Sequence, residues 1–218
     1  MVAIAIDGPA GAGKSTIARA AAQRLSYLYV DTGALYRAIA FFMQERRLDN
    51  EAEIVAALGE VEVNLKFVDG VQRVFLCGED VTEKIRTPQI SMTASKISAI
   101  PEVREFLLYL QRDLAQKNNV LMDGRDIGTV ILPNADVKIF LTASSEARAQ
   151  RRHKELLEKG LQSSYEEVLA DILKRDHDDS TRVVAPLKQA EDAILVDTSD
   201  CNLDESIELV LRVVKENL

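Results

Sequence analysis

A glycine-rich loop near the N-terminus carries the most specific chemistry in this chain. It reads Gly8-Pro9-Ala10-Gly11-Ala12-Gly13-Lys14-Ser15-Thr16 and fits the pattern G-x-x-x-x-G-K-[ST]. Glycines let backbone N–H groups approach phosphate oxygens, Lys14 would reach the β- and γ-phosphates, and Ser15 would complete the coordination of a nucleotide-bound Mg²⁺. The loop therefore predicts a nucleoside triphosphate site, in preference to a chance glycine turn between a strand and a helix.

Two further segments place charged residues directly after apolar runs. Residues 31–37 read D-T-G-A-L-Y-R and open a helix, with Thr32 as its expected cap. Residues 123–126 read D-G-R-D and follow an apolar run, at the strand end where ligands bind open parallel sheets. Asp123 is then expected to reach the magnesium ion through water. Taken alone, D-G-R-D is equally well explained as a tight turn with a salt bridge.

Arginines recur in the second half of the chain, at positions 125, 148, 151, 152, 175 and 182. The planar guanidinium binds phosphate through two hydrogen bonds and keeps its charge, so these residues are candidates for gripping an anion. A solvated helix face is the competing explanation for each one. The formal net charge of −8 argues against a broad surface for nucleic acid or acidic membranes, so any anion must be bound locally.

Composition bounds the class of protein. The 218 residues are 47% hydrophobic and include no apolar stretch near the roughly 20 residues needed to cross a bilayer. The N-terminus also lacks the flanks of a signal peptide, so we expect a cytoplasmic protein with no membrane partner. Cys77 and Cys201 lie far apart and only two histidines accompany them, which predicts no zinc site.

The elements that must position these residues alternate along the chain. Apolar runs at 2–6, 28–30, 120–122, 137–141 and 193–196 are typical of strands buried on both faces of a sheet. Helical patterns cover 16–25, 34–46, 103–117, 145–159, 165–175 and 204–216. This order predicts an α/β P-loop NTPase fold, with a five-stranded parallel sheet and helices on both faces. Ser163 with Glu166, or Ser164 with Glu167, offers a capping box for the fifth of these helices.

One segment breaks the alternation. Residues 61–68 and 71–77 alternate apolar and polar side chains around the turn signal Asp69-Gly70, which predicts an antiparallel hairpin. We expect this hairpin and residues 79–98 to form a small β lobe inserted between the second and third core strands. An ordinary edge hairpin is the alternative. The predicted domains are a core of 1–59 and 101–218, with a lid at about 148–162, and an inserted lobe of 60–100.

Six segments together resemble the bacterial cytidylate kinases, a branch of the nucleoside monophosphate kinases. In order they are I-D-G-P-A-G-A-G-K-S-T, D-T-G-A-L-Y-R, G-E-D-V-T-E-K-I-R-T, P-E-V-R-E, D-G-R-D-I-G-T-V and R-D-H-D-D-S-T-R-V-V-A-P-L. The hairpin insert is the most discriminating, because it separates these enzymes from adenylate kinases and eukaryotic pyrimidine monophosphate kinases. The resemblance implies transfer of the γ-phosphoryl group of ATP to CMP or dCMP, with Mg²⁺ as cofactor and the lobe binding the monophosphate.

The resemblance also implies a role for each candidate residue. Residues 8–16 would bind ATP, with Lys14 catalytic. Thr32 and Arg182 would lie at the acceptor monophosphate, and Arg37 and Arg125 would bind its phosphate group. The pentose hydroxyls would be bound by Ser95, Arg175 and Asp179. Arg104 and Asp126 would face the cytosine ring. Arg125 and the lid residues Arg148, Arg151 and Arg152 would stabilise the transferring phosphoryl group.

Transfer between two phosphates needs no general base, so catalysis should consist of positioning and positive charge, with lid and lobe closing to exclude water. Lys14 is expected on the surface, where it adds little packing. Three alternatives remain: a kinase for another acceptor such as UMP, a GTPase-like switch, and a nucleic-acid-binding ATPase. The chain holds no N-K-x-D segment and no interleaved aromatic and basic residues, so the last two are disfavoured. We expect a monomer whose partners are nucleotides.

Overall fold

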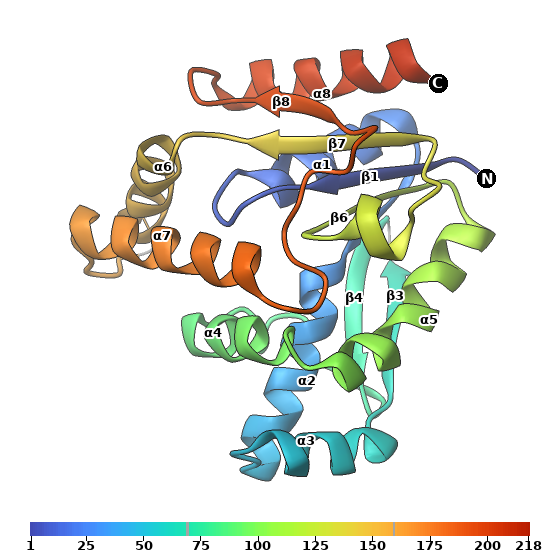
Figure 1. The fold of residues 1–218 in the computed structure, drawn as a ribbon, viewed down its shortest axis with the longest axis vertical. Helices are drawn as coiled ribbons and strands as arrows, with labels where there is room; N and C mark the ends of the chain where they lie inside the picture. The colour runs from blue at the N-terminus through green and yellow to red at the C-terminus, as the bar shows by residue number, and fades with distance from the viewer. Residues whose placement is uncertain (69, 159) are drawn as a thin grey trace.

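The central sheet has five parallel strands in the order β2-β6-β1-β7-β8 (Figure 1). The computed structural model describes residues 1–68, 70–158 and 160–218. The strands are β1 (Ala3–Asp7), β2 (Leu28–Asp31), β6 (Val120–Gly124), β7 (Val137–Thr142) and β8 (Ile194–Asp197). All four pairings are parallel, so the predicted strands and fold class are confirmed.

Helices cover both faces of this sheet because its central strands are apolar on both sides. Ile4 and Ile6 of β1 pack with α1 (Lys14–Leu25) and α8 (Leu203–Asn217), whereas Ala5 faces α5 (Pro101–Lys117) and a short π-helical turn. The turn is η2 (Ile127–Ile131), and the other helices flanking the site are α2 (Thr32–Arg46), α6 (Ser145–Glu158) and α7 (Tyr165–Thr181).

Helix α7 continues six residues beyond the predicted 165–175, and this places Arg175 and Asp179 on one helix, one turn apart. Of the two possible capping boxes, the structure forms the one between Ser164 and Glu167. Lys159, the expected last residue of the preceding helix, lies outside the described residues.

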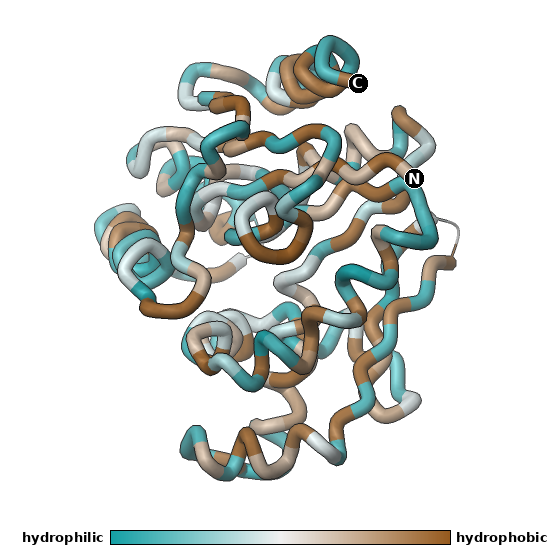
Figure 2. Tube along the Cα trace, turned by 45° about the vertical axis from the view of Figure 1, so that its right-hand side comes forward, coloured by the Kyte–Doolittle hydropathy of each residue, from teal (hydrophilic) through white to brown (hydrophobic). Residues whose placement is uncertain are grey.

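The hairpin forms a sheet of its own, separate from the core sheet. Strands β3 (Val63–Val68) and β4 (Val71–Leu76) pair antiparallel, and the short β5 (Glu79–Asp80) joins β4. Figure 2 shows the expected alternation of hydrophobic and hydrophilic residues along this pair. Asp69, the first residue of the predicted turn, lies outside the described residues. The lobe boundaries of 60–100 stay a prediction.

The hairpin packs on α2 through a continuous apolar cluster. This cluster runs from Ala34 in α2 to Leu107 in α5 and includes α3 (Glu51–Ala57), η1 (Leu58–Glu60) and α4 (Pro88–Ile97). The lobe therefore shares its core with the helix that carries Arg37. None of the helices in the described ranges combines the length and apolar composition that a bilayer-spanning segment needs.

Candidate functional site

The glycine loop joins β1 to α1, as predicted, and its backbone conformation requires glycine. Gly8, Gly11 and Gly13 have φ values of 151°, 74° and 81°. A Cβ on Gly8 would lie 1.9 Å from the carbonyl oxygen of Leu141 on β7, so no side chain fits there. Gly13 is the N-cap of α1 and offers no capping side chain. The positive end of the helix therefore faces the loop without a competing acceptor from its cap.

Lys14 is buried at the base of the loop, with only 5% of its surface exposed. The prediction of a surface lysine is therefore wrong, because α1 carries this residue inward against the sheet. Its Nζ donates to the carbonyl oxygen of Pro9 at 2.6 Å. Burial and the nearby charge of Arg125 lower the pKa of Lys14 well below its usual range. A bound phosphate would supply the negative charge that this ammonium lacks.

Ser15 and Asp123 meet beside the loop. The Ser15 hydroxyl donates to Asp123 Oδ2 at 2.9 Å, and the Tyr29 hydroxyl donates to Oδ1 at 3.0 Å. Burial, followed by the charge of Asp31, raises the pKa of Asp123 to about 6. Across the described ranges no group of three or more His, Cys, Asp and Glu could hold a metal. One hydroxyl and one carboxylate suit a magnesium ion whose remaining ligands are phosphate and water oxygens.

Helix α2 begins with a carboxylate instead of the expected threonine cap. Asp31 Oδ1 accepts from the N–H of Ala34 at 3.1 Å, so Asp31 is the N-cap. Thr32 is already helical and buried, and its hydroxyl donates to the Asp123 carbonyl at 2.8 Å. Asp31 Oδ2 accepts from Arg37 at 2.7 Å, while Arg37 Nε is buried without a partner. Arg37 thus keeps an unused donor at the site.

Four arginines gather opposite the loop. Arg125 donates from Nε to the buried Asp179 carboxylate at 2.9 Å. Arg175 lies close enough to Arg125, Arg152 and Arg37 that their charges, after burial, lower its pKa. The Nε of Arg175 is also buried without a partner. Positive charge therefore exceeds negative charge here, which is what binding of an anion would relieve.

A second polar cluster lies deeper, between α5 and the loop after β6. Arg104 donates to Asp126 and, at 2.9 Å, to the carbonyl of Ser98. Arg182 lies 3.6 Å from the other oxygen of Asp126, and its NH1 donates to Ser98 Oγ at 3.2 Å. Ser98 Oγ donates in turn to the carbonyl of Ser95 on α4. Arg104, Asp126 and Arg182 are thus brought together, with Ser95 at their border.

The three lid arginines are not equivalent. Arg148 is buried and donates to the carbonyl of Ala10, at 2.8 Å, while pairing with Asp176 at 2.7 Å, so it supports the phosphate loop. Arg152 pairs with Glu155 and lies near Arg175. Arg151 instead donates to the carbonyls of Thr198 and Cys201, beyond the end of β8. The structure does not bring Arg151 to the other two.

Sequence analysis missed four carboxylates and hydroxyls that support the site: Asp7, Tyr29, Asp31 and Asp176. Asp7 accepts the N–H groups of Ile127 and Gly128, each at 2.7 Å, and burial raises its pKa to about 6. Asp7 and Asp31 each end a strand, a signal that was available but applied only to Asp123. Tyr29 and Asp176 carried no such signal.

Comparison with known proteins bears on this geometry. The sequence model of the family described as "Cytidylate kinase" matches residues 4–216. The chain belongs to the cytidylate kinase family. It is 53% identical to the cytidylate kinase of Carboxydothermus hydrogenoformans over 97% of this chain and 96% of that one. Identity to the cytidylate kinase of Caldicellulosiruptor bescii is 51%, over 96% and 94%. The predicted resemblance is confirmed.

Solved structures agree on the fold of this cytidylate kinase family member. Shikimate kinase from Bacteroides thetaiotaomicron superimposes with a TM-score of 0.50 at 13% identity, covering 98% of each chain. An uncharacterized protein from Eubacterium ventriosum gives 0.54 at 12% identity, over 99% of this chain and 98% of that one. At these identities the likeness concerns the fold alone.

Proposed function

We propose that this protein transfers the γ-phosphoryl group of ATP to CMP or dCMP, giving ADP and CDP or dCDP. One observation carries the proposal: Ser15 of the glycine loop donates to Asp123 at 2.9 Å, in the same D-G-R-D segment that carries Arg125. A triphosphate on the loop and a monophosphate on the arginines would therefore adjoin. The family names of the relatives support the same reaction.

The chain's own residues supply positioning and charge. Backbone N–H groups of the glycine loop hold the donor phosphates, and Lys14 neutralises the group in transfer. Arg37 and Arg125 hold the acceptor phosphate, whose anionic oxygen is already a nucleophile at neutral pH. Arg152 and Arg175 add positive charge, while Arg148 supports the loop that carries the donor. The catalytic role of Arg151 stays a prediction, because its guanidinium lies beyond β8.

Magnesium would be held at Ser15, with Asp123 acting on it through water, since these two groups lie within hydrogen-bond distance beside the loop. When bound, the ion draws charge from the phosphate oxygens and helps to orient them. Tyr29 fixes the Asp123 carboxylate for this purpose.

The cluster of Arg104, Asp126 and Arg182 favours cytosine over uracil as the acceptor base. A carboxylate accepts a hydrogen bond from the exocyclic amine of cytosine. Uracil places a carbonyl oxygen at that position, which would repel Asp126. Asp179, Arg175 and Ser95 border the cluster and are the proposed readers of the pentose.

Initial rates with ATP and each of CMP, dCMP, UMP and AMP test this function. CMP and dCMP should be phosphorylated fastest, because uracil lacks the exocyclic amine and adenine lacks the carbonyl oxygen that cytosine presents beside its ring nitrogen. Equal or faster turnover of UMP would instead favour the alternative of a kinase for another pyrimidine acceptor. Monomeric state and cytoplasmic location stay predictions.

A further inference from the structure

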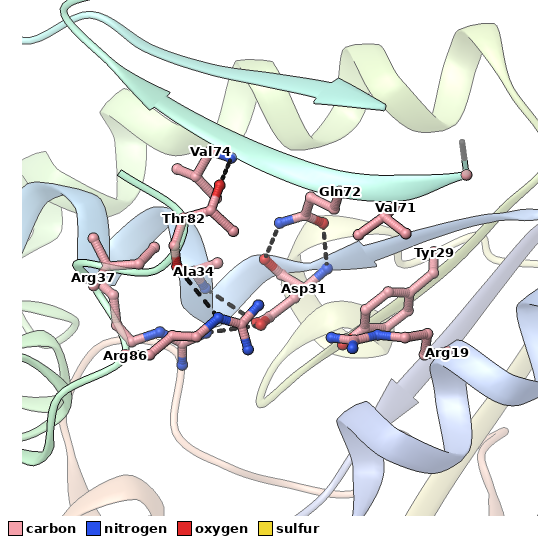
Figure 3. A pocket seen from close by; sticks show the side chains of 12 residues that line it. Arg19, Tyr29, Asp31, Ala34, Arg37, Val71, Gln72, Val74, Thr82 and Arg86 are labelled. Carbon is pink, nitrogen blue, oxygen red and sulfur yellow. Dashed lines mark hydrogen bonds and ion pairs between the residues drawn. The ribbon is translucent and has the colours of Figure 1, made fainter. Parts of the chain in front are cut away.

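The inserted lobe contacts the core at a pocket between α1, α2 and β4 (Figure 3). Strand β2 forms the edge of the core sheet and pairs through β6 only, so its outer edge faces the lobe. Strand β4 belongs to the other sheet, and within the described residues no ladder pairing connects it to β2. The polar backbone groups at the end of β2 therefore depend on side chains for their partners.

Gln72 on β4 supplies a partner to both backbone polar groups of one residue at the end of the edge strand, Asp31. Its Oε1 accepts from the N–H of Asp31 at 2.8 Å, and its Nε2 donates to the Asp31 carbonyl at 3.3 Å. The side chain is buried, with 8% of the residue exposed. A primary amide is suited to this role because it presents one donor and one acceptor in a plane, as a neighbouring strand would. Glutamate lacks the donor and leucine lacks both.

The residue held in this way is the one that orients Arg37. Figure 3 shows Gln72 over the Asp31 backbone, with the Asp31 carboxylate directed to Ala34 and Arg37 on the other side. A Cβ built on Gly33 would lie only 3.2 Å from Asp31 Oδ1 and 3.5 Å from an Arg37 nitrogen, so the turn is closely packed. A rotation of the Asp31 backbone would therefore displace the carboxylate and the guanidinium together.

We infer that Gln72 is a positioning residue for the acceptor site, linking the inserted lobe to Arg37 through Asp31. The inference rests on the proposed role of Arg37 in binding the acceptor phosphate. Gln72 itself reaches no reacting group. Its two hydrogen bonds keep the Asp31 backbone from turning toward solvent, and the Asp31 backbone sets the direction of the carboxylate that holds Arg37.

The first test compares Gln72→Leu with Gln44→Leu. Gln44 is exposed near the end of α2. The same substitution there leaves the hydrogen bonds between Gln72 and Asp31 intact and controls for replacing a glutamine by an apolar side chain. Gln72→Leu leaves the buried Asp31 N–H without its partner and removes one donor from the Asp31 carbonyl, which should raise the KM for CMP about tenfold. The KM for ATP should stay within about twofold of wild type in both variants, because the hydrogen bonds that Gln72 and Asp31 make within the described residues do not reach the glycine loop. Gln44→Leu should keep both constants.

A double-mutant cycle with Arg37→Ala separates positioning from general loss of structure. If Gln72 acts through Arg37, the substitution Gln72→Leu should raise the KM for CMP by less than twofold once Arg37 is absent. Gln72→Glu keeps the acceptor for the Asp31 N–H and should give an intermediate rise in the KM for CMP. If Gln72→Leu fails to fold, the Gln72→Glu variant provides the test.

Three results would overturn the inference. One is a KM for CMP near the wild-type value in Gln72→Leu and Gln72→Glu; another is a rise of full size in the Arg37→Ala background. The third is a parallel rise in both KM values, which indicates loss of structure. An unchanged KM for CMP in Arg37→Ala alone would instead refute the acceptor role of Arg37, on which this inference depends, and so identifies that failure separately.

Discussion

The two anion sites proposed for this molecule would present positive charge by different means. The proposed donor site offers mainly backbone N–H groups of the glycine loop, together with the buried ammonium of Lys14. The proposed acceptor site offers guanidinium groups from α2, from the loop after β6 and from the C-terminal end of α7. Three of them, on Arg37, Arg125 and Arg182, lie against carboxylates.

This difference follows from what each site must tolerate. Backbone donors cannot change with sequence, and they suit the invariant triphosphate tail of any nucleotide. The arginines held by Asp31, Asp179 and Asp126 offer hydrogen-bond donors in fixed directions. The carboxylates reduce the repulsion between neighbouring guanidinium groups and add hydrogen-bond acceptors. We therefore expect side chains to discriminate between acceptor nucleotides. Substitutions should be able to impair the binding of donor or of acceptor separately.

Lys14→Met should produce the largest effect on the donor side. The variant keeps the buried methylenes and removes the charge, so kcat should fall about a thousandfold with little change in thermal unfolding. Initial rates of ADP formation and circular dichroism provide the two measurements. Turnover near the wild-type rate would disprove the assignment of the loop as the donor site.

Gly8→Ala should break the donor site by adding an atom. The new Cβ would meet the Leu141 carbonyl at 1.9 Å, so β1 and β7 must separate or the loop must rearrange. We expect unfolding in urea to lose about 3 kcal/mol or more of stability, together with ATP binding. Gly59→Ala is the matched control, because its Cβ meets nothing within 4 Å and should cost little. Equal stability of the two variants would contradict this account.

Arg125→Ala should damage the acceptor side by removing a group. Loss of a guanidinium from the acceptor phosphate should lower kcat/KM for CMP about a hundredfold, while the KM for ATP changes little. Steady-state kinetics with each substrate varied in turn measures both. Equal losses for the two substrates would show that the sites are not separable at this residue.

Asp7 connects the two sites, because it ends β1 before the donor loop and binds the N–H groups of Ile127 and Gly128 after the acceptor loop. Its pKa of about 6 in the folded state lies above the unfolded value near 4, so the folded state binds the proton more tightly. Its contribution to the free energy of unfolding should therefore rise by about 1 kcal/mol from pH 7 to pH 5. Urea titrations of wild type and Asp7→Asn should differ by this slope. Parallel pH profiles would refute it.

Sequence patterns predicted several residues of the proposed acceptor site, but not their local environment. Arg37, Arg125 and Asp126 lie in short segments directly after apolar strands, and the fold places such strand ends at one edge. The patterns also predicted Thr32 as the helix cap and Lys14 on the surface. Both predictions were wrong, because neighbouring Asp31 caps the helix and tertiary packing buries Lys14.

The sequence by itself determined the donor loop, the alternation of strands and helices, the separate hairpin and the family. These are local or periodic properties, encoded within a few residues of one another. Only the tertiary structure decided which polar groups pair: Arg148 with Asp176, Arg125 with Asp179, and the Gln72 amide with the Asp31 backbone. These partners lie 28, 54 and 41 residues apart in the sequence. Their meeting depends on how helices and lobe pack on the sheet, which no local pattern specifies.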